Sequence, residues 1–138
     1  MAGAAHSMRV RGDTAELARV RRRVGAWAEA AGLNDARARR LQLAVDEAVA
    51  NAIEHGMADG GHVVVRGAPG RDRLTVIVRY RGARFDPTTA PATPAREVVQ
   101  AHSEHGYGLH LIRRLVDELG YRWDRGTNEV RLTVGRAS

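Results

Sequence analysis

Two carboxylates and one amide recur at helical spacing between residues 41 and 56, where the chain reads LQLAVDEAVANAIEHG. At about 100° per residue, Glu47, Asn51 and Glu54 form one polar stripe along the border of a broad apolar arc. A carboxylate can orient or deprotonate a nucleophile, and an amide oxygen one turn later can hold a hard cation. Magnesium-dependent phosphoryl transfer needs such a pair, although a solvated helix edge explains these residues equally well when they are taken alone. The arc consists of Leu41, Ala44, Val45, Ala48, Val49 and Ala52.

A second motif joins glycines to the start of a helix. Residues 105–112 read HGYGLHLI, a glycine-hinged loop that runs into an amphipathic helix. The N-terminus of a helix presents free backbone N–H groups and a positive dipole end, which suit a phosphate. A Gly-x-Gly before a helix is more often an ordinary turn, but this one follows an expected strand at Leu74–Tyr80 and a loop ending in Phe85, Asp86 and Pro87.

The helix, the strand with its following loop, and the glycine-hinged helix start occur along the chain in the order found in the Bergerat-fold ATPases. The chain thus resembles this GHKL superfamily, which includes sensor histidine kinases, gyrase, Hsp90 and MutL. Within it, the segments EAVANAIEHG, RGARFDP, GYGLHLIRRLVDELG and NEVRLTV look most like bacterial anti-sigma-factor serine/threonine kinases, from Arg9 to Arg136. The resemblance implies ATP and Mg²⁺ as cofactors, with Glu47 as the catalytic glutamate and Asn51 as the magnesium ligand at the nucleotide. It also implies a turn that meets the nucleotide phosphates, formed by Gly106, Gly108 and Leu109.

The loop after the expected central strand departs from the family pattern. The family has an aspartate, any residue and then Gly-x-Gly-Phe-Asp-Pro, whereas this chain has Tyr80 for the aspartate and Arg84 for the second glycine. Tyr80 and Gly82 thus stand at cofactor-binding positions, but a neutral phenol is a poorer acceptor for the adenine amino group than a carboxylate. Arg84 would be strained if the loop needs positive φ there. Either the nucleotide is held differently or the pocket has decayed, and Tyr80 could be an ordinary core-edge aromatic.

The periodicity of apolar residues predicts the elements that position these motifs. Helices are expected from a cap at Asp13 or Thr14 to Gly32, from a cap at Asn34 or Asp35 to about His55, and over Leu109–Leu119. Strands are expected at Met8–Arg11, His62–Arg66, Leu74–Tyr80, Tyr121–Asp124 and Glu129–Val134. This layout predicts an α/β (α+β) two-layer sandwich, with a mixed, mostly antiparallel sheet and helices on one face.

Composition limits both the size and the chemistry of the protein. With 138 residues, 43% of them hydrophobic, we expect a flexible N-terminus at 1–7 and one compact domain at 8–136. The resemblance implies that this is a histidine-kinase-like ATPase domain in which 87–105 form a lid-like loop. All 22 basic residues are arginine, so a P-loop lysine and a Schiff-base lysine are excluded. Cysteine is absent, which excludes disulfides and thiolate nucleophiles.

The net charge of +6 raises the question of nucleic acid as a partner. The arginines are scattered and aromatic residues for base stacking are few, so we expect no direct nucleic-acid binding. Basic clusters at Arg19–Arg23 and Arg37–Arg40 would instead attract acidic partners. With no apolar run near 18 residues and no secretion signal, the chain is expected to be cytoplasmic and to have no membrane partner.

Two functions remain open at this level. The resemblance implies an ATP-binding regulator that binds a sigma factor and/or phosphorylates an anti-sigma-factor antagonist, and it suggests a homodimer. If active as an enzyme, such a protein is an ATP-dependent serine/threonine kinase, in which Glu47 acts on the receiving hydroxyl. The alternative is a degenerate Bergerat-fold module that acts by protein–protein interaction without kinase activity, as the substitutions at Tyr80 and Arg84 would allow.

Overall fold

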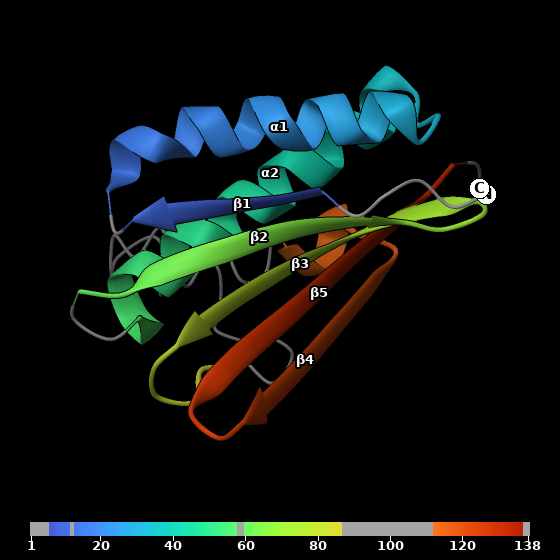
Figure 1. Cartoon of the computed structure of the whole chain (residues 1–138). Coiled ribbons are helices and arrows are strands. Elements are labelled where there is room, and N and C mark those ends of the chain that lie inside the picture. The colour runs from blue at the N-terminus through green and yellow to red at the C-terminus, as the bar shows by residue number, and fades with distance from the viewer. Residues whose placement is uncertain (1–5, 12, 58–59, 87–111, 137–138) are drawn as a thin grey trace, which may run out of the picture.

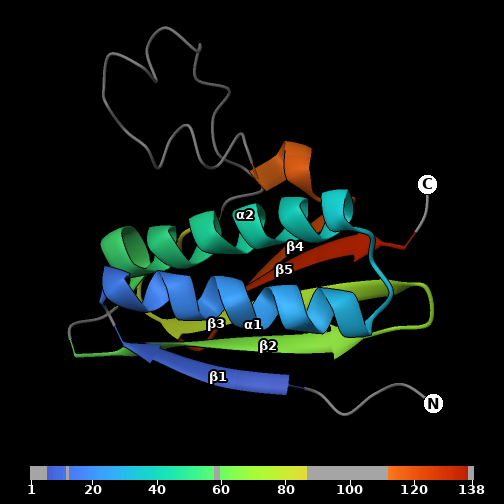
Figure 2. The same cartoon turned by 90° about the horizontal axis from the view of Figure 1, so that it is seen from above.

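Helices α1 and α2 pack side by side on one face of a five-stranded sheet (Figures 1 and 2). The structure is a computed structural model that describes residues 6–11, 13–57, 60–86 and 112–136. Its helical segments are the 3₁₀ turn η1 (Thr14–Glu16), α1 (Leu17–Ala30), α2 (Asp35–Asn51) and the π turn η2 (Ala52–Gly56). Its strands are β1 (His6–Arg11), β2 (His62–Pro69), β3 (Arg73–Arg81), β4 (Glu118–Asp124) and β5 (Thr127–Gly135).

The strands are arranged in the order β1-β2-β3-β5-β4, and each neighbouring pair is antiparallel. Side chains alternate between the two faces along each strand, and those on the helix-covered face are apolar and buried. They include Val63 and Val65 of β2, Val76 and Val78 of β3, and Val130 and Leu132 of β5. The predicted two-layer α/β sandwich with helices on one face is confirmed, with antiparallel pairing throughout its described strands.

Polar side chains cap the η1 turn and helix α2. The Asp13 carboxylate accepts a hydrogen bond from the Ala15 N–H at 2.8 Å, and the Asn34 side chain accepts one from the Arg37 N–H at 2.9 Å. These contacts satisfy backbone donors that have no partner within a first helical turn. Gly32, with φ of +83°, reverses the chain between α1 and α2 in a conformation that glycine adopts at low cost. The predicted cap of α2 is therefore present, whereas the N-cap of α1 is Glu16, whose side chain makes no capping hydrogen bond, and Asp13 binds the η1 turn before it.

The apolar arc predicted for the second helix is buried in full. Leu41, Ala44, Val45 and Val49 have no exposed surface, and Ala48 and Ala52 are similarly enclosed. On the side of α2 toward α1, a 3.0 Å ion pair joins Arg21 to Asp46. The arc fixes the rotation of α2 on the sheet, because turning the helix would bring apolar side chains into water.

Element boundaries differ from the sequence prediction at several points. Strand β1 begins at His6 rather than Met8, and α2 continues into a π turn instead of remaining α-helical to His55. The prediction of a helix through Leu119 is wrong: residues 112–115 are helical, and Leu119 lies in β4 opposite Leu132. Asp117 explains the early end of this helix, since its N–H donates to the Thr133 carbonyl at 2.8 Å and its carboxylate accepts from the Gly135 N–H at 2.7 Å.

No helix in the described ranges is long and apolar enough to cross a membrane.

A tryptophan of helix α1 packs directly on a glycine of β2. The buried Trp27 ring lies over Gly67, and a Cβ atom on Gly67 would come within 2.8 Å of the ring. Trp27 also stacks on His6 of β1, with ring centroids 5.8 Å apart. At Gly67 the Trp27 ring therefore leaves no room for a side chain between α1 and the sheet.

We expect Gly67→Ala to lower the free energy of unfolding by about 1–3 kcal/mol, because the added methyl group pushes Trp27 off the sheet. Gly120→Ala in β4 is the matched control, since its Cβ would lie 3.6 Å from the Cβ of Arg131, an ordinary contact. Urea denaturation of the two variants measures the difference. Equal stability of the two variants would show that Trp27 does not pack tightly on Gly67.

Candidate functional site

The end of α2 lies beside the end of β3, as both views of the fold show (Figures 1 and 2). Asn51 is the last residue of α2 and Tyr80 is the penultimate residue of β3, and each side chain is 3% exposed. Gly82, just past β3, pairs with Met57 in an isolated antiparallel bridge. The structure therefore brings three predicted site residues, Asn51, Tyr80 and Gly82, to one end of the sandwich.

The polar stripe of α2 is divided by the π turn. Glu47 and Asn51 lie one α-helical turn apart, the first half-buried and the second buried. After Asn51 the Met57 N–H donates to the Ala52 carbonyl at 2.7 Å, five residues back, so the chain makes a wider turn. Glu54, within this turn, is exposed. Single π turns of this kind often occur at functional sites, and this one leaves Glu47 and Asn51 as the close pair of the stripe.

The loop after β3 is held by a buried amide from β5. Asn128 has no exposed surface, and its oxygen accepts from the Phe85 N–H at 3.0 Å while its nitrogen donates to the Ala83 carbonyl at 2.9 Å. The Tyr121 hydroxyl donates to the same Asn128 oxygen and accepts from the Phe85 N–H at 3.1 Å. These contacts fix the loop backbone without a regular element.

Sequence reasoning missed Asn128 and Tyr121 as positioning residues. The sequence did hold a signal for Asn128. It lies two residues before Val130 in β5, so its side chain points to the buried face of the sheet, where an apolar side chain is normal. A buried amide at such a position needs hydrogen-bond partners. The sequence could not show that these partners are the backbone groups of residues 83 and 85.

A ring contact ties this loop to the π turn. Phe85 stacks on His55, with centroids 5.6 Å apart and planes inclined by 25°. Together with the bridge between Met57 and Gly82, this contact joins the end of α2 to residues 82–86. The two segments therefore form one wall around the end of the helix.

The two tyrosines near this wall are neutral at physiological pH. Burial, and then the nearby Tyr121 phenol, raise the pKa of Tyr80 above its ordinary value. Burial is also the main cause that raises the pKa of Tyr121. Tyr80 consequently brings no negative charge to the position at which the family has an aspartate, and it packs in the apolar core.

The strain expected at Arg84 is not observed. Among the described non-glycine residues, positive φ occurs at Arg125 and not at Arg84. The side chains of Asn128 and Tyr121 hold the loop, so it passes residue 84 without the left-handed backbone that would require glycine. Arg84 therefore does not by itself argue for a decayed site.

The remaining predicted site residues lie outside the described ranges. These are Gly106, Gly108 and Leu109, together with the predicted lid at 87–105. In the part that is described, no cluster of three or more His, Cys, Asp or Glu could hold a metal ion. A single Asn oxygen nevertheless fits Mg²⁺, which commonly takes few protein ligands and completes its coordination with phosphate oxygens and water.

The chain is similar to known proteins in both sequence and fold. A family model described as the histidine kinase-like ATPase domain matches residues 10–134. A serine-protein kinase RsbW of Bacillus velezensis is 40% identical over 93 residues, which are 62% of this chain and 58% of that protein. A serine/threonine-protein kinase BtrW of Bordetella bronchiseptica is 30% identical over 115 residues, 78% of this chain and 80% of that protein. The match to the Bacillus kinase thus spans little more than half of its length.

A solved structure has the same fold over nearly the whole chain. The crystal structure of the RsbU and RsbW domains of Rv1364c from Mycobacterium tuberculosis superposes with a TM-score of 0.69 and 21% identity. The match covers 96% of this chain and 32% of that one. At this identity the likeness establishes the fold.

We expect Asn128→Ala to loosen the loop after β3, because it leaves the Ala83 carbonyl without its side-chain donor and removes one acceptor of the Phe85 N–H. The loss should cost about 1–3 kcal/mol of stability and speed hydrogen exchange at the Phe85 amide. Tyr121→Phe is the comparison: it removes the second acceptor of the Phe85 N–H but retains both Asn128 contacts to the loop backbone, so it should speed the exchange less than Asn128→Ala does. Unchanged exchange at Phe85 in Asn128→Ala would refute the positioning role.

Proposed function

The chain belongs to the histidine kinase-like ATPase family, and we propose that it is an ATP-dependent protein kinase that phosphorylates a serine or threonine of a regulatory partner. One observation carries this proposal: Glu47 and Asn51 lie one turn apart at the end of α2 that the Met57–Gly82 bridge joins to the loop after β3. This arrangement supports a nucleotide pocket that has a carboxylate and an amide at its edge. The names of the RsbW and BtrW relatives, both protein kinases, add support.

Each residue has a distinct role in the proposed reaction. Glu47 orients or deprotonates the receiving hydroxyl, since a half-buried carboxylate next to a phosphate site can accept its proton. Asn51 offers its amide oxygen to Mg²⁺, which when bound neutralises charge on the phosphates. Tyr80 and Gly82 lie at the adenine end, and Gly106, Gly108 and Leu109 would hold the phosphates through backbone N–H groups. Positioning and charge neutralisation supply most of the catalysis in such a transfer.

The proposed partners are those implied by the resemblance to anti-sigma-factor kinases. They are a sigma factor, an anti-sigma-factor antagonist that receives the phosphate, or both, and a second copy of the chain in a homodimer. These encounters would take place in the cytoplasm. Related proteins named serine-protein kinase support a hydroxyl-bearing protein substrate over a small molecule.

A second candidate function is that of a binding module without kinase activity. Its supporting observation is Tyr80, a buried neutral phenol where the family has a carboxylate for the adenine amino group. The half-buried Glu47 and buried Asn51 favour the kinase, because a module that only bound proteins would not need this pair at the helix end. The ordinary backbone of Arg84 removes one reason to regard the loop as decayed.

Glu47→Gln separates the two functions. The change keeps the shape of the side chain but removes its basicity, so phosphate incorporation from γ-labelled ATP into an anti-sigma-factor antagonist of the source organism should fall by roughly 10²–10⁴-fold. Glu54→Gln, at the exposed end of the same stripe, is the control and should retain the activity. Thermal unfolding should be alike for both variants. Transfer that persists in Glu47→Gln would exclude Glu47 as the base, and absence of transfer in the wild type would favour the binding module.

A further inference from the structure

The sheet has a second face that neither α1 nor α2 covers (Figures 1 and 2). Residues on this face alternate with the buried valines and are aligned across the strands by the antiparallel register. Arg9 of β1, Val64 of β2 and Arg79 of β3 form one row across it, in which each is the register partner of the next. In the neighbouring row Arg11 is the register partner of His62, and Arg81 follows on β3.

The part of this face formed by β1, β2 and β3 is basic. Its outward side chains on these strands include no aspartate or glutamate, whereas the outward acids of the sheet, Glu118, Asp124 and Glu129, lie on β4 and β5. We call the following set the basic face: Arg9, Arg11, His62, Arg66, Arg79 and Arg81. All six are exposed.

Acidic neighbours neutralise little of this charge. Arg79 contacts Glu129 at 3.5 Å, but the same carboxylate is shared with Arg131 at 3.0 Å. Within the described ranges, Arg9, Arg11, Arg66 and Arg81 form no ion pair with a carboxylate. Several guanidinium groups gathered on one surface repel one another and attract an anionic partner over a distance.

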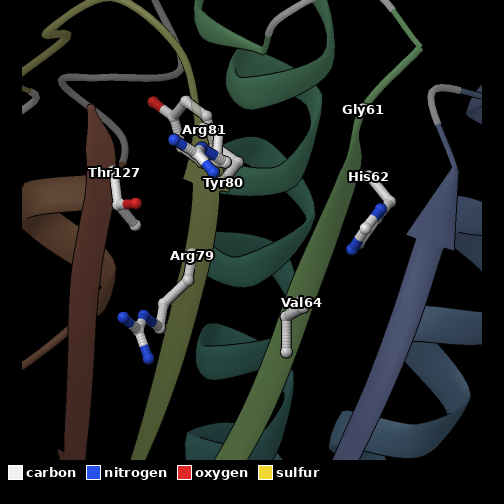
Figure 3. Close-up of a pocket in the computed structure, with 7 residues that line it drawn as sticks. All are labelled: Gly61, His62, Val64, Arg79, Tyr80, Arg81 and Thr127. Carbon is white, nitrogen blue, oxygen red and sulfur yellow. The ribbon is translucent and has the colours of Figure 1, made fainter. Parts of the chain in front are cut away.

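A hollow of about 260 Å³ lies in the basic face, and Figure 3 shows it with α2 behind the strands. Val64 provides an apolar contact there, and Arg79, Arg81 and His62 provide polar groups around it. Successive outward residues of a strand are roughly 6.6–6.8 Å apart, the same spacing as alternate side chains of an extended peptide. An extended segment that runs along β2 can therefore place an apolar side chain near Val64 and carboxylates near His62 and Arg66, the outward residues before and after it on the strand.

We propose that the basic face is a docking surface for an extended acidic segment of a partner protein. The guanidinium fork binds a carboxylate through two parallel hydrogen bonds, which explains how exposed arginines would select such a segment. Nucleic acid fits less well, because register places Tyr121 and Trp123 on the opposite side of the sheet, and Tyr80, which lines the hollow, is buried. The exposed aromatic ring of the basic face is that of His62, so the face offers little surface on which successive bases could stack. The proposal depends on neither ATP nor phosphoryl transfer.

Fluorescence anisotropy with a labelled peptide of alternating glutamate and valine tests this surface. We expect saturable binding to the wild-type protein that weakens as salt is added. The double variant Arg9→Glu/Arg66→Glu should bind the peptide roughly tenfold more weakly or worse, because two attractive contacts become repulsive. Neither residue belongs to the proposed nucleotide site, so phosphoryl transfer measured in the same preparations reports separately on the kinase proposal.

The control is Arg113→Glu/Arg114→Glu, which makes the same charge change at exposed positions of the helical residues 112–115, outside the basic face. It should bind the peptide nearly as well as the wild type, and thermal unfolding of both double variants checks that the fold is intact. Absence of peptide binding, or equal weakening by the two double variants, would overturn the proposal. Tighter binding of an oligothymidylate of equal charge would overturn it in favour of a nucleic-acid surface.

Discussion

Burial of one side of α2 against the sheet is the interaction on which the rest of the structure depends. The arc from Leu41 to Ala52 is buried, and the helix contacts β3 and β5. Because the helix is 17 residues long and cannot turn about its axis without exposing this arc, its last turn has a fixed position. That position places Asn51 beside the end of β3 and leaves Glu47 half-buried at the edge of the same helix.

The other half of the site depends on hydrogen bonds rather than on apolar packing. Residues 82–86 have no regular structure, and their backbone is held by Asn128 and Tyr121 from the two strands on the far side of β3. A buried amide that binds both an N–H and a carbonyl of the loop leaves the loop few alternatives. With the loop held by these hydrogen bonds, Arg84 stands where the family pattern has a glycine and does not adopt a positive φ.

The parts of the fold that follow from local periodicity could be predicted from the sequence. Apolar spacing at 41–52 predicted the buried arc of α2, and alternation in β3 predicted that Tyr80 faces the core. Three features could not be predicted in this way: the π turn after Asn51, the end of the helix before Asp117, and the hydrogen bonds from Asn128 to the loop after β3. Each depends on contacts between segments distant in sequence: Met57 with Gly82, Asp117 with β5, and Asn128 with residues 83 and 85. Tertiary contacts of this kind override local preference.

Calorimetric titration of ATP, with Mg²⁺ present and with Mg²⁺ removed by a chelator, tests most directly whether the end of α2 is a magnesium–nucleotide site. The account predicts saturable binding that is tighter with Mg²⁺, loss of that difference in Asn51→Ala, and its retention in Asn51→Asp, which keeps an oxygen donor. Equal ATP affinity with and without Mg²⁺ in the wild type, or a magnesium effect that survives in Asn51→Ala, would contradict it.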